Sequence, residues 1–199
     1  DRSGREGDPG ETGTGAGGAA DMSYDPTTYE IKAIETRYKG YLFRSRLEAT
    51  WAAFFDLCGW PWEYEPFELD GWLPDFILFG KTKVLVEVKP VFKFPEEVAD
   101  RISNASKSFT DMELMILGCG IIKYDFADSC IGWVTQEKSW WEGSVLKYAD
   151  NNFVDFTHTH GRWKGYISGH YDGDVNIGLE NAKLLFGRAK EMTRYVHKP

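Results

Sequence analysis

Apolar residues recur at helical spacing over residues 43–60, and residues 95–109 predict a helix from how they begin. In residues 43–60 this stripe predicts a helix, with Ser45 at its N-cap and Glu48 completing a capping box. Gly59 suits the position just after the last turn, where glycine often ends a helix. Residues 95–109 open with Pro and two acidic residues, which is typical of a helix start.

Strand patterns lie between and after these helices. Residues 61–79 predict two short strands joined by a turn at Leu69-Asp70-Gly71, and residues 82–92 predict a third strand that Pro90 ends or bends. Two further strands are expected over 112–120 and 129–136.

The last helix is expected over residues 179–196, after a less regular, aromatic-rich stretch. The order of elements therefore predicts an α/β fold, with a mixed sheet flanked by helices and a C-terminal extension. The residues of the last helix expected to point inward are Leu184, Leu185, Ala189 and Met192.

The first 23 residues differ from the rest, because they are rich in Gly, Thr and acidic residues and carry almost no large apolar side chain. Such a segment cannot bury enough surface to offset its ordering entropy, so we expect a flexible tail or linker there. Residues 24–199 are expected to form a single domain, whose fold begins between Tyr24 and Tyr41.

Composition narrows the class of protein. With 42% apolar residues among 199, the chain can form one sizeable core, and no apolar run approaches the length of a membrane span. We also see no secretory signal, and three irregularly spaced cysteines favour a reducing, cytoplasmic compartment over a disulfide framework. A net charge of -8 argues against a general polyanion binder, although five acids and only two bases lie in the first 22 residues.

The third strand carries the candidate chemistry. Side chains alternate along a strand, so Val84, Val86 and Val88 share one face, and Glu87 and Lys89 stand together on the other. Two charged residues, Glu87 and Lys89, are unusual in the most strand-like segment of the chain and indicate a functional role.

Asp75 lies on the preceding strand, and a hairpin register would bring its carboxylate beside Glu87. Two carboxylates in a low-dielectric setting repel each other unless a cation lies between them. Carboxylate oxygens are the ligands of hard divalent ions, so Mg²⁺ or Mn²⁺ would resolve the conflict. Lys89 could then assist a metal-activated water or neutralise charge in the transition state of phosphoryl transfer.

At these residues the sequence resembles the PD-(D/E)xK nuclease superfamily, which includes restriction endonucleases and Holliday-junction resolvases. Pro74-Asp75 matches the first element, Glu87-Val88-Lys89 matches the second, and residues 76–86 separate them. The resemblance implies a restriction-endonuclease-like core of helix, three antiparallel strands, helix and strand. It covers residues 41–120 and leaves 121–199 as an extension.

The resemblance also implies a reaction and residue roles. The expected activity is metal-dependent hydrolysis of nucleic acid, with DNA as the favoured partner and RNA as the alternative. Catalytic roles would fall to Glu48, Asp75, Glu87 and Lys89, and Glu48, Asp75, Glu87 and the backbone carbonyl of Val88 would hold the metal. Exonuclease-like branches carry a Gln and a Tyr on the helix after the lysine strand, and residues 95–109 contain neither.

Basic residues outside this motif are candidates for phosphate contacts. In residues 161–166 they alternate with aromatic side chains, a mixture that can grip nucleic acid by charge and stacking and that also suits an ordinary strand. The expected nucleic-acid contacts are Arg44, Arg101, Lys107, Arg162 and Lys164.

Simpler interpretations stay open for each feature. The motif charges could form a cross-strand salt-bridge set, and Glu48 could serve only the capping box or a pair with Arg44. His158 and His160 are more typical of loop histidines than of a zinc module. The whole chain could instead be a catalytically silent nucleic-acid-binding or protein-docking module of the same fold within a larger machine. For the assembly of the chain, a homodimer and a larger complex both stay open.

Overall fold

The computed structural model describes residues 33–109, 111–137, 140–149, 152–160, 164–170 and 176–194. The predicted tail, residues 1–23, and the predicted phosphate contact Arg162 lie outside the described residues.

The described residues form an α/β structure with a seven-stranded mixed sheet, a separate two-stranded sheet and three helices. In the large sheet the strands follow sequence order, and every neighbouring pair is antiparallel except β5 and β6. Its strands are β3 Trp62–Tyr64, β4 Phe76–Leu78, β5 Lys83–Val88, β6 Met112–Tyr124, β7 Ala127–Gln136, β8 Trp140–Tyr148 and β9 Val154–His158.

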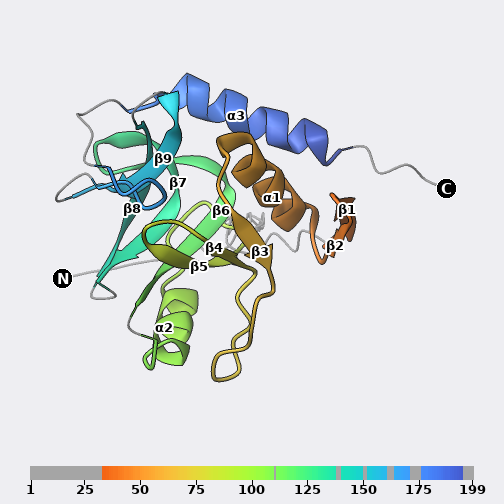
Figure 1. Cartoon of the computed structure of the whole chain (residues 1–199), viewed down its shortest axis with the longest axis vertical. Coiled ribbons are helices and arrows are strands. Elements are labelled where there is room, and N and C mark those ends of the chain that lie inside the picture. The colour runs from red at the N-terminus through yellow and green to blue at the C-terminus, as the bar shows by residue number, and fades with distance from the viewer. Residues whose placement is uncertain are drawn as a thin grey trace, which may run out of the picture.

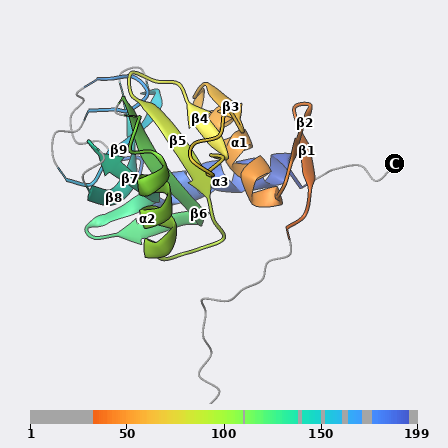
Figure 2. The same cartoon turned by 90° about the horizontal axis from the view of Figure 1, so that it is seen from below.

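The helices divide between the two faces of this sheet. Helices α1 (Arg46–Cys58) and α3 (Leu179–Met192) pack together on one face, and α2 (Glu96–Ala105) lies on the other (Figures 1 and 2). Helix α2 is the crossover between the parallel strands β5 and β6, as a parallel pair requires. The order α1, β3, β4, β5, α2, β6 is the order expected from the sequence.

Helix α1 begins and ends as its sequence predicts. The Ser45 hydroxyl accepts the backbone N–H of Glu48 at 3.1 Å, so it satisfies one of the unpaired donors of the first turn. At the other end Gly59 adopts a left-handed φ of 71°, and its N–H donates to the Asp56 carbonyl at 3.1 Å. Capping therefore fixes the start of α1 at Arg46, two residues after Arg44.

The hairpin between β3 and β4 also matches expectation. Leu69 and Trp72 exchange two backbone hydrogen bonds of 2.7 Å around Asp70 and Gly71. Both turn residues have positive φ, 42° and 77°, as a tight hairpin turn of this kind demands. The chain then returns through residue 75 into β4.

Strand β5 is buried on both faces. Val84, Val86 and Val88 belong to the core beneath α1 and α3, whereas Leu85 belongs to the core beneath α2. The predicted alternation is therefore confirmed, and Glu87 falls on the α2 side of the sheet by the same periodicity.

Two parts of the chain contain strands that were not predicted. The stretch predicted to be less regular contains β8 and β9. The hydrophobic pattern did not reveal β8 because this strand buries the polar residues Glu142, Ser144 and Lys147 among its apolar residues. A two-stranded hairpin, β1 (Thr36–Tyr38) and β2 (Tyr41–Phe43), also precedes α1 without having been predicted.

The inward face of α3 differs from the predicted one. Ala182, Phe186 and Ala189 are buried, but Leu184 is 65% exposed and Met192 is 43% exposed. Apolar residues occupy both sides of this helix, so periodicity alone did not select the side that packs. The expectation holds for Ala189 and for the partly buried Leu185.

Two further findings bear on the class of protein. None of the helices in the described residues is long and apolar enough to cross a membrane. Cys58, Cys119 and Cys130 are all free thiols, and Cys58 and Cys130 are buried.

Candidate active site

The register of β4 and β5 places Asp75 opposite Glu87. Phe76 pairs with Val86, so the residue before Phe76 faces the residue after Val86. Both carboxylates are buried, with exposures of 4% for each residue. The structure therefore brings together the two residues that carry the sequence motif.

Asp75 is held by one backbone donor and one side-chain donor. Its Oδ2 accepts the N–H of Val88 at 2.6 Å, and its Oδ1 accepts from Arg44 Nη2 at 2.6 Å. Val88 thus reaches Asp75 through its amide nitrogen, and the role expected for its carbonyl stays a prediction. The Asp75 carbonyl accepts the N–H of Glu65 at 2.9 Å, which fixes the backbone of this residue as well.

Glu87 is surrounded by donors from three different segments. Trp72 Nε1 donates to Oε2 at 2.7 Å from the hairpin turn. Lys89 Nζ lies 2.7 Å from Oε1, and Arg101 Nη2 reaches the same oxygen from α2 at 3.0 Å. The carboxylate is therefore oriented by a rigid indole on one side and by two long cationic side chains on the other.

Glu48 joins this cluster from the first turn of α1. Its Oε1 accepts from the Ser45 hydroxyl at 2.8 Å, and its Oε2 accepts from the Tyr64 hydroxyl at 2.7 Å. The capping-box interpretation of Glu48 is thus correct as far as it goes. Glu48 also adds negative potential at Asp75, so the residue belongs to both arrangements.

Burial and charge repulsion shape the titration of this cluster. Burial, followed by repulsion from Glu87, raises the pKa of Asp75 to about 7, although the Val88 amide and Lys89 oppose the shift. Burial and the hydrogen bond to Glu48 also raise the pKa of the Tyr64 hydroxyl above its ordinary value. Burial and mutual repulsion therefore disfavour ionisation of the Asp75 carboxyl beside Glu87 and Glu48.

Three cations balance this charge in the structure. Arg44 Nη2 bonds Asp75, while its Nε lies 2.8 Å from Glu65 Oε1 and 4.0 Å from Glu48 Oε2. Lys89 and Arg101 pair with Glu87. The side chains of Arg44 and Arg101 are each more than half exposed, so they reach the carboxylates from the solvent side.

The carboxylates suit a hard divalent cation because they offer oxygen ligands and because their mutual repulsion favours a bound positive charge. Asp75 and Glu87 offer oxygen ligands in a buried, mutually repulsive setting, which is where Mg²⁺ or Mn²⁺ binds in proteins. No group of three or more His, Cys, Asp or Glu side chains within the described ranges is arranged around a common metal position. Instead, Arg44, Lys89 and Arg101 occupy the carboxylate oxygens that such an ion would use.

Of the basic residues expected to contact phosphate, two lie at the carboxylate cluster and two others in the described part of the chain lie in different segments. Arg44 and Arg101 lie at the carboxylate cluster. Lys107 is exposed in the turn after α2. Lys164 lies in a segment whose next residues, Tyr166 and Ile167, bond the backbone of residues 81–82, at the opposite end of β5 from Glu87.

Sequence reasoning missed two members of the cluster, Trp72 and Tyr64. Trp72 follows the tight turn and Tyr64 ends β3, and both positions suit core aromatics equally well. The available signal was the hairpin itself, because it returns both residues toward the motif strands. Arg44 was expected to bind phosphate or to pair with Glu48, and its contacts with Asp75 and Glu65 were not foreseen.

Two histidines contact Glu142 on β8, but only His158 is buried on β9; His160 lies beyond the end of β9 with its side chain 55% exposed, as a loop histidine should. His158 Nδ1 lies 3.2 Å from Glu142 Oε2, and the N–H of His160 donates to the same oxygen at 2.7 Å. Burial lowers the pKa of His158, and the neighbouring Glu142 opposes that shift. His158 is thus a buried strand residue and not a loop histidine.

Comparison with known proteins adds no relative: no protein-family model, curated protein or solved structure matches this chain.

Proposed function

We propose that this chain is a divalent-metal-dependent phosphodiesterase of the restriction-endonuclease-like type, acting on DNA as an endonuclease. The element order α1, β3–β5, α2, β6, with β6 parallel to β5, supports this assignment. The proposal is also supported by the position of Asp75 and Glu87 opposite each other at the adjoining ends of β4 and β5.

A single observation carries the proposal, namely the paired burial of Asp75 and Glu87 on neighbouring strands. Buried carboxylates of a purely structural kind are normally satisfied by fixed donors. Here Arg44, Lys89 and Arg101 supply much of the compensation, and each of them can swing away. Such an arrangement favours exchange of one set of positive charges for another.

A divalent ion bound by Asp75 and Glu87 would supply the positive charge and the acidified water needed for attack on phosphorus. Arg44 would then leave Asp75 Oδ1, and Lys89 and Arg101 would leave Glu87 Oε1. The released cations are positioned to meet phosphate oxygens, where charge grows in the transition state. Lys89 stands closest to the reaction in this scheme because it adjoins Glu87 on β5.

Trp72, Tyr64 and Ser45 act as positioning residues. Trp72 Nε1 keeps one oxygen of Glu87 engaged while leaving the other for exchange. Tyr64 and Ser45 each bind one oxygen of Glu48 and hold it toward Asp75. These three donors are neutral, so they orient the carboxylates without cancelling their charge.

Cleavage assays test the proposal. Wild type, Asp75→Asn, Glu87→Gln and Lys89→Ala would be incubated with plasmid, linear and branched DNA and with RNA, in Mg²⁺ or Mn²⁺. We expect wild-type cleavage and a loss of at least about 100-fold in each variant. Lys83→Ala, at the exposed start of β5, is the matched control and should cleave normally. Equal cleavage by wild type and the site variants would identify a contaminant and refute the proposal.

The complete pairing of the site carboxylates with cations favours a second candidate. A catalytically silent nucleic-acid-binding or docking module could keep Arg44, Lys89 and Arg101 as permanent partners of the carboxylates. This alternative predicts no cleavage with any divalent ion and binding that Lys89→Ala leaves unchanged. A stable protein partner recovered without nucleic acid would support the docking form.

A further inference from the structure

The segment between β5 and α2, residues 89–95, carries an aromatic ring into solvent beside the candidate active site. Phe92 is 71% exposed, which is the largest exposed fraction among the large apolar side chains of the described residues. It lies three residues after Lys89, so the two Cα atoms are at most about 11 Å apart. An exposed ring this close to a charged site calls for a reason other than packing within the chain.

The backbone just before Phe92 is fixed to β6. The N–H of Cys119 donates to the Val91 carbonyl at 3.0 Å, and the N–H of Val91 donates to the Lys89 carbonyl at 2.8 Å in a tight turn. A Cβ at Gly118 would overlap the Val91 carbonyl, so this close approach needs glycine. Phe92 therefore projects from a short turn whose start is held by hydrogen bonds.

Phe94 fixes the segment on the other side of the exposed ring. Its own ring packs against Trp133 and Trp141, with centroids 5.7 and 5.8 Å away, on the α2 side of the sheet. The residues that flank Phe92 and Lys93 are thus partly buried, and these two side chains alone are exposed between them. A ring presented in this way loses little conformational freedom when a ligand covers it.

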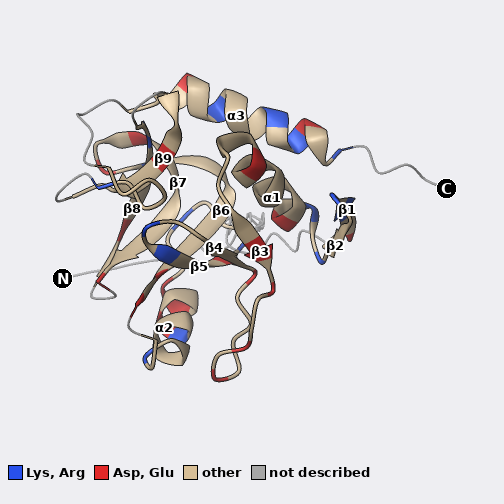
Figure 3. Ribbon diagram, viewed as in Figure 1, with Lys and Arg blue, Asp and Glu red and all other residues tan. Residues whose placement is uncertain are grey.

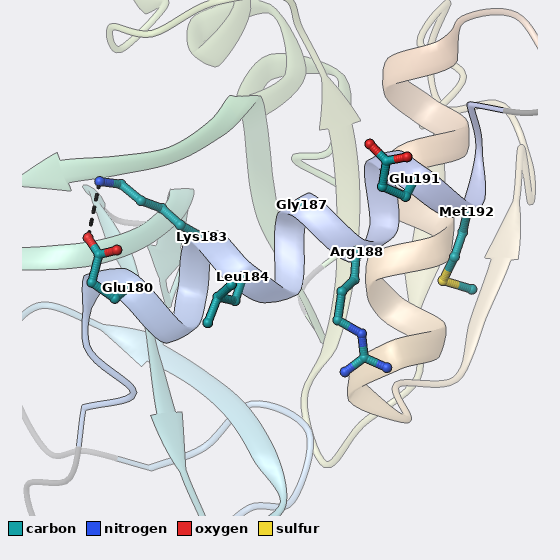
Figure 4. Close-up of a pocket in the computed structure, with 7 residues that line it drawn as sticks. All are labelled: Glu180, Lys183, Leu184, Gly187, Arg188, Glu191 and Met192. Atoms are coloured by element: carbon teal, nitrogen blue, oxygen red, sulfur yellow. Dashed lines mark hydrogen bonds and ion pairs between the residues drawn. The ribbon is translucent and has the colours of Figure 1, made fainter.

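Lys93, next to the exposed ring, has no ion pair with any of the described residues. The outer face of α3 differs in this respect. Leu184 is 65% exposed there, but charges of both signs are interspersed along the helix (Figure 3), and the neighbouring Lys183 lies 3.5 Å from Glu180 (Figure 4). A ligand that covers Phe92 and its neighbour should therefore combine negative charge with a flat apolar face.

A nucleotide combines these two properties, because it joins a phosphate to a flat base. Stacking of bases on aromatic side chains, together with cations along the backbone, is how proteins hold single-stranded nucleic acid. Inside an intact duplex both faces of a base are covered by its neighbours, so a side chain reaches the base only after it is unstacked. The exposed ring therefore favours a nucleotide that is already unpaired.

We propose that Phe92 stacks on an unpaired base of the substrate strand beside the active site, and that Lys93 pairs with a phosphate of the same strand. This contact rests on the proposed function, because it requires nucleic acid to reach Lys89. It narrows the substrate to nucleic acid with unpaired nucleotides close to the cut, such as single strands and branch points. Intact duplex would first have to unstack, so it gains less from this contact.

Binding of a fluorescent oligonucleotide of about 20 nucleotides, as single strand and as duplex, tests the contact separately from cleavage. Anisotropy would be measured in EDTA, and in Mg²⁺ with every chain carrying Asp75→Asn. Phe92→Ala should weaken single-strand binding by about tenfold and duplex binding by less than about twofold. Phe92→Leu, which keeps apolar area without a ring, should behave like Phe92→Ala, and Phe92→Trp should restore binding. Phe79→Ala removes an exposed ring at the opposite end of β4 from Asp75 and is the matched control.

Salt dependence separates the two side chains. Lys93→Ala should lower the slope of log affinity against log salt concentration by about 0.7, as expected for one phosphate of a single strand, whereas Phe92→Ala should leave the slope unchanged. Circular dichroism confirms that each variant is folded.

The outcomes for this contact and for cleavage are distinguishable. Single-strand affinity that is unchanged in Phe92→Ala, or that falls equally in Phe79→Ala, would overturn the contact even if the chain cleaves DNA. Failure of the wild-type and Asp75→Asn chains to bind the oligonucleotide would overturn it as well. A tenfold loss confined to the single strand, in a chain that never cleaves, would support the contact and contradict only the proposed cleavage.

Discussion

Two buried aspartates of this chain show how differently a negative charge can be held. Asp155 on β9 has no exposed surface, and its oxygens accept the backbone N–H groups of Phe156, Ile167 and Ser168 at 2.7, 3.0 and 2.8 Å. Asp75 accepts one backbone N–H, from Val88, and one guanidinium, from Arg44. The donors to Asp155 are therefore backbone groups, whereas one of the two donors to Asp75 is a side chain that can move.

The difference in donors means that Asp155 is held permanently, whereas Asp75 can exchange one of its partners. Asp155 fixes the segment 164–168 against β9, and its donors cannot leave unless that segment unfolds. Asp75 keeps its place through Val88, while Arg44, which is 56% exposed, can be replaced by another cation. Burial alone therefore does not mark a functional carboxylate in this fold. Under the proposed function, the exposed side-chain partner of Asp75 is what distinguishes it from Asp155.

The largest expected effect is on stability, at Asp155. Asp155→Ala leaves three backbone donors without their acceptor, so we expect a loss of roughly 3–5 kcal/mol in the free energy of unfolding. Asp75→Ala removes a charge that is repelled by Glu87 and should cost about 1 kcal/mol or less. Urea denaturation measures both variants, and equal losses would remove the distinction between the two residues.

A smaller effect on stability is expected at Gly165. A methyl group added there would overlap the Asp155 carboxylate and crowd the Ser168 hydroxyl. We expect Gly165→Ala to lower the free energy of unfolding by about 2 kcal/mol. Gly187→Ala, where a Cβ meets open space, is the control and should be neutral or stabilising. A stable Gly165→Ala would show that the backbone cage around Asp155 can yield.

The pH dependence of stability distinguishes the aspartates next. The pKa of Asp75, raised by burial to about 7, means that the folded state keeps a proton that the unfolded state releases near pH 4. This contribution to stability is present at acid pH and is lost as the pH rises through 7. The stability that is lost between roughly pH 6 and 8 is about 1 kcal/mol.

Asp75→Asn cannot lose this proton, so its loss of stability over the same interval should be smaller than that of wild type. Denaturation curves at the two pH values give the comparison, with the exposed Asp125→Asn as control. If wild type and Asp75→Asn change in parallel, the carboxyl of Asp75 is already ionised at pH 6.

The smallest predicted effect concerns Arg44 as a counter-ion. Arg44→Gln removes the cation that competes for Asp75 Oδ1, so Mn²⁺ should bind about fivefold more tightly. Calorimetric titration with Mn²⁺ alone measures this without any substrate. Arg46→Gln, two residues away and at the start of α1, serves as the control. Weaker Mn²⁺ binding by Arg44→Gln would mean that Arg44 supports the site only structurally.

The motif strands were predictable because local rules agree there. Alternation along β5, the tight turn at Asp70 and Gly71 and the cap at Ser45 each depend on neighbouring residues, and all three are confirmed. The approach of Asp75 to Glu87 follows from them, since the hairpin connection and the pleat leave few registers.

The remaining features depend on contacts between distant parts of the chain. Arg44 meets Asp75 across 31 residues, and Trp72 meets Glu87 only because the hairpin turns back. Strand β8 carries Lys147 inside the core, which no hydrophobic pattern reveals. The exposed side of α3 was misassigned because apolar residues lie on both of its faces. Roles for Asp75, Glu87, Lys89 and Glu48 stay predictions.

A crystal structure of the chain with Mn²⁺, read through the anomalous signal of the metal, tests the central claim most directly. The proposal predicts a peak bound by the carboxylates of Asp75 and Glu87, with Arg44 withdrawn from Asp75 Oδ1 and Lys89 from Glu87 Oε1. A structure at saturating Mn²⁺ with no peak there, and with both ion pairs intact, would contradict it.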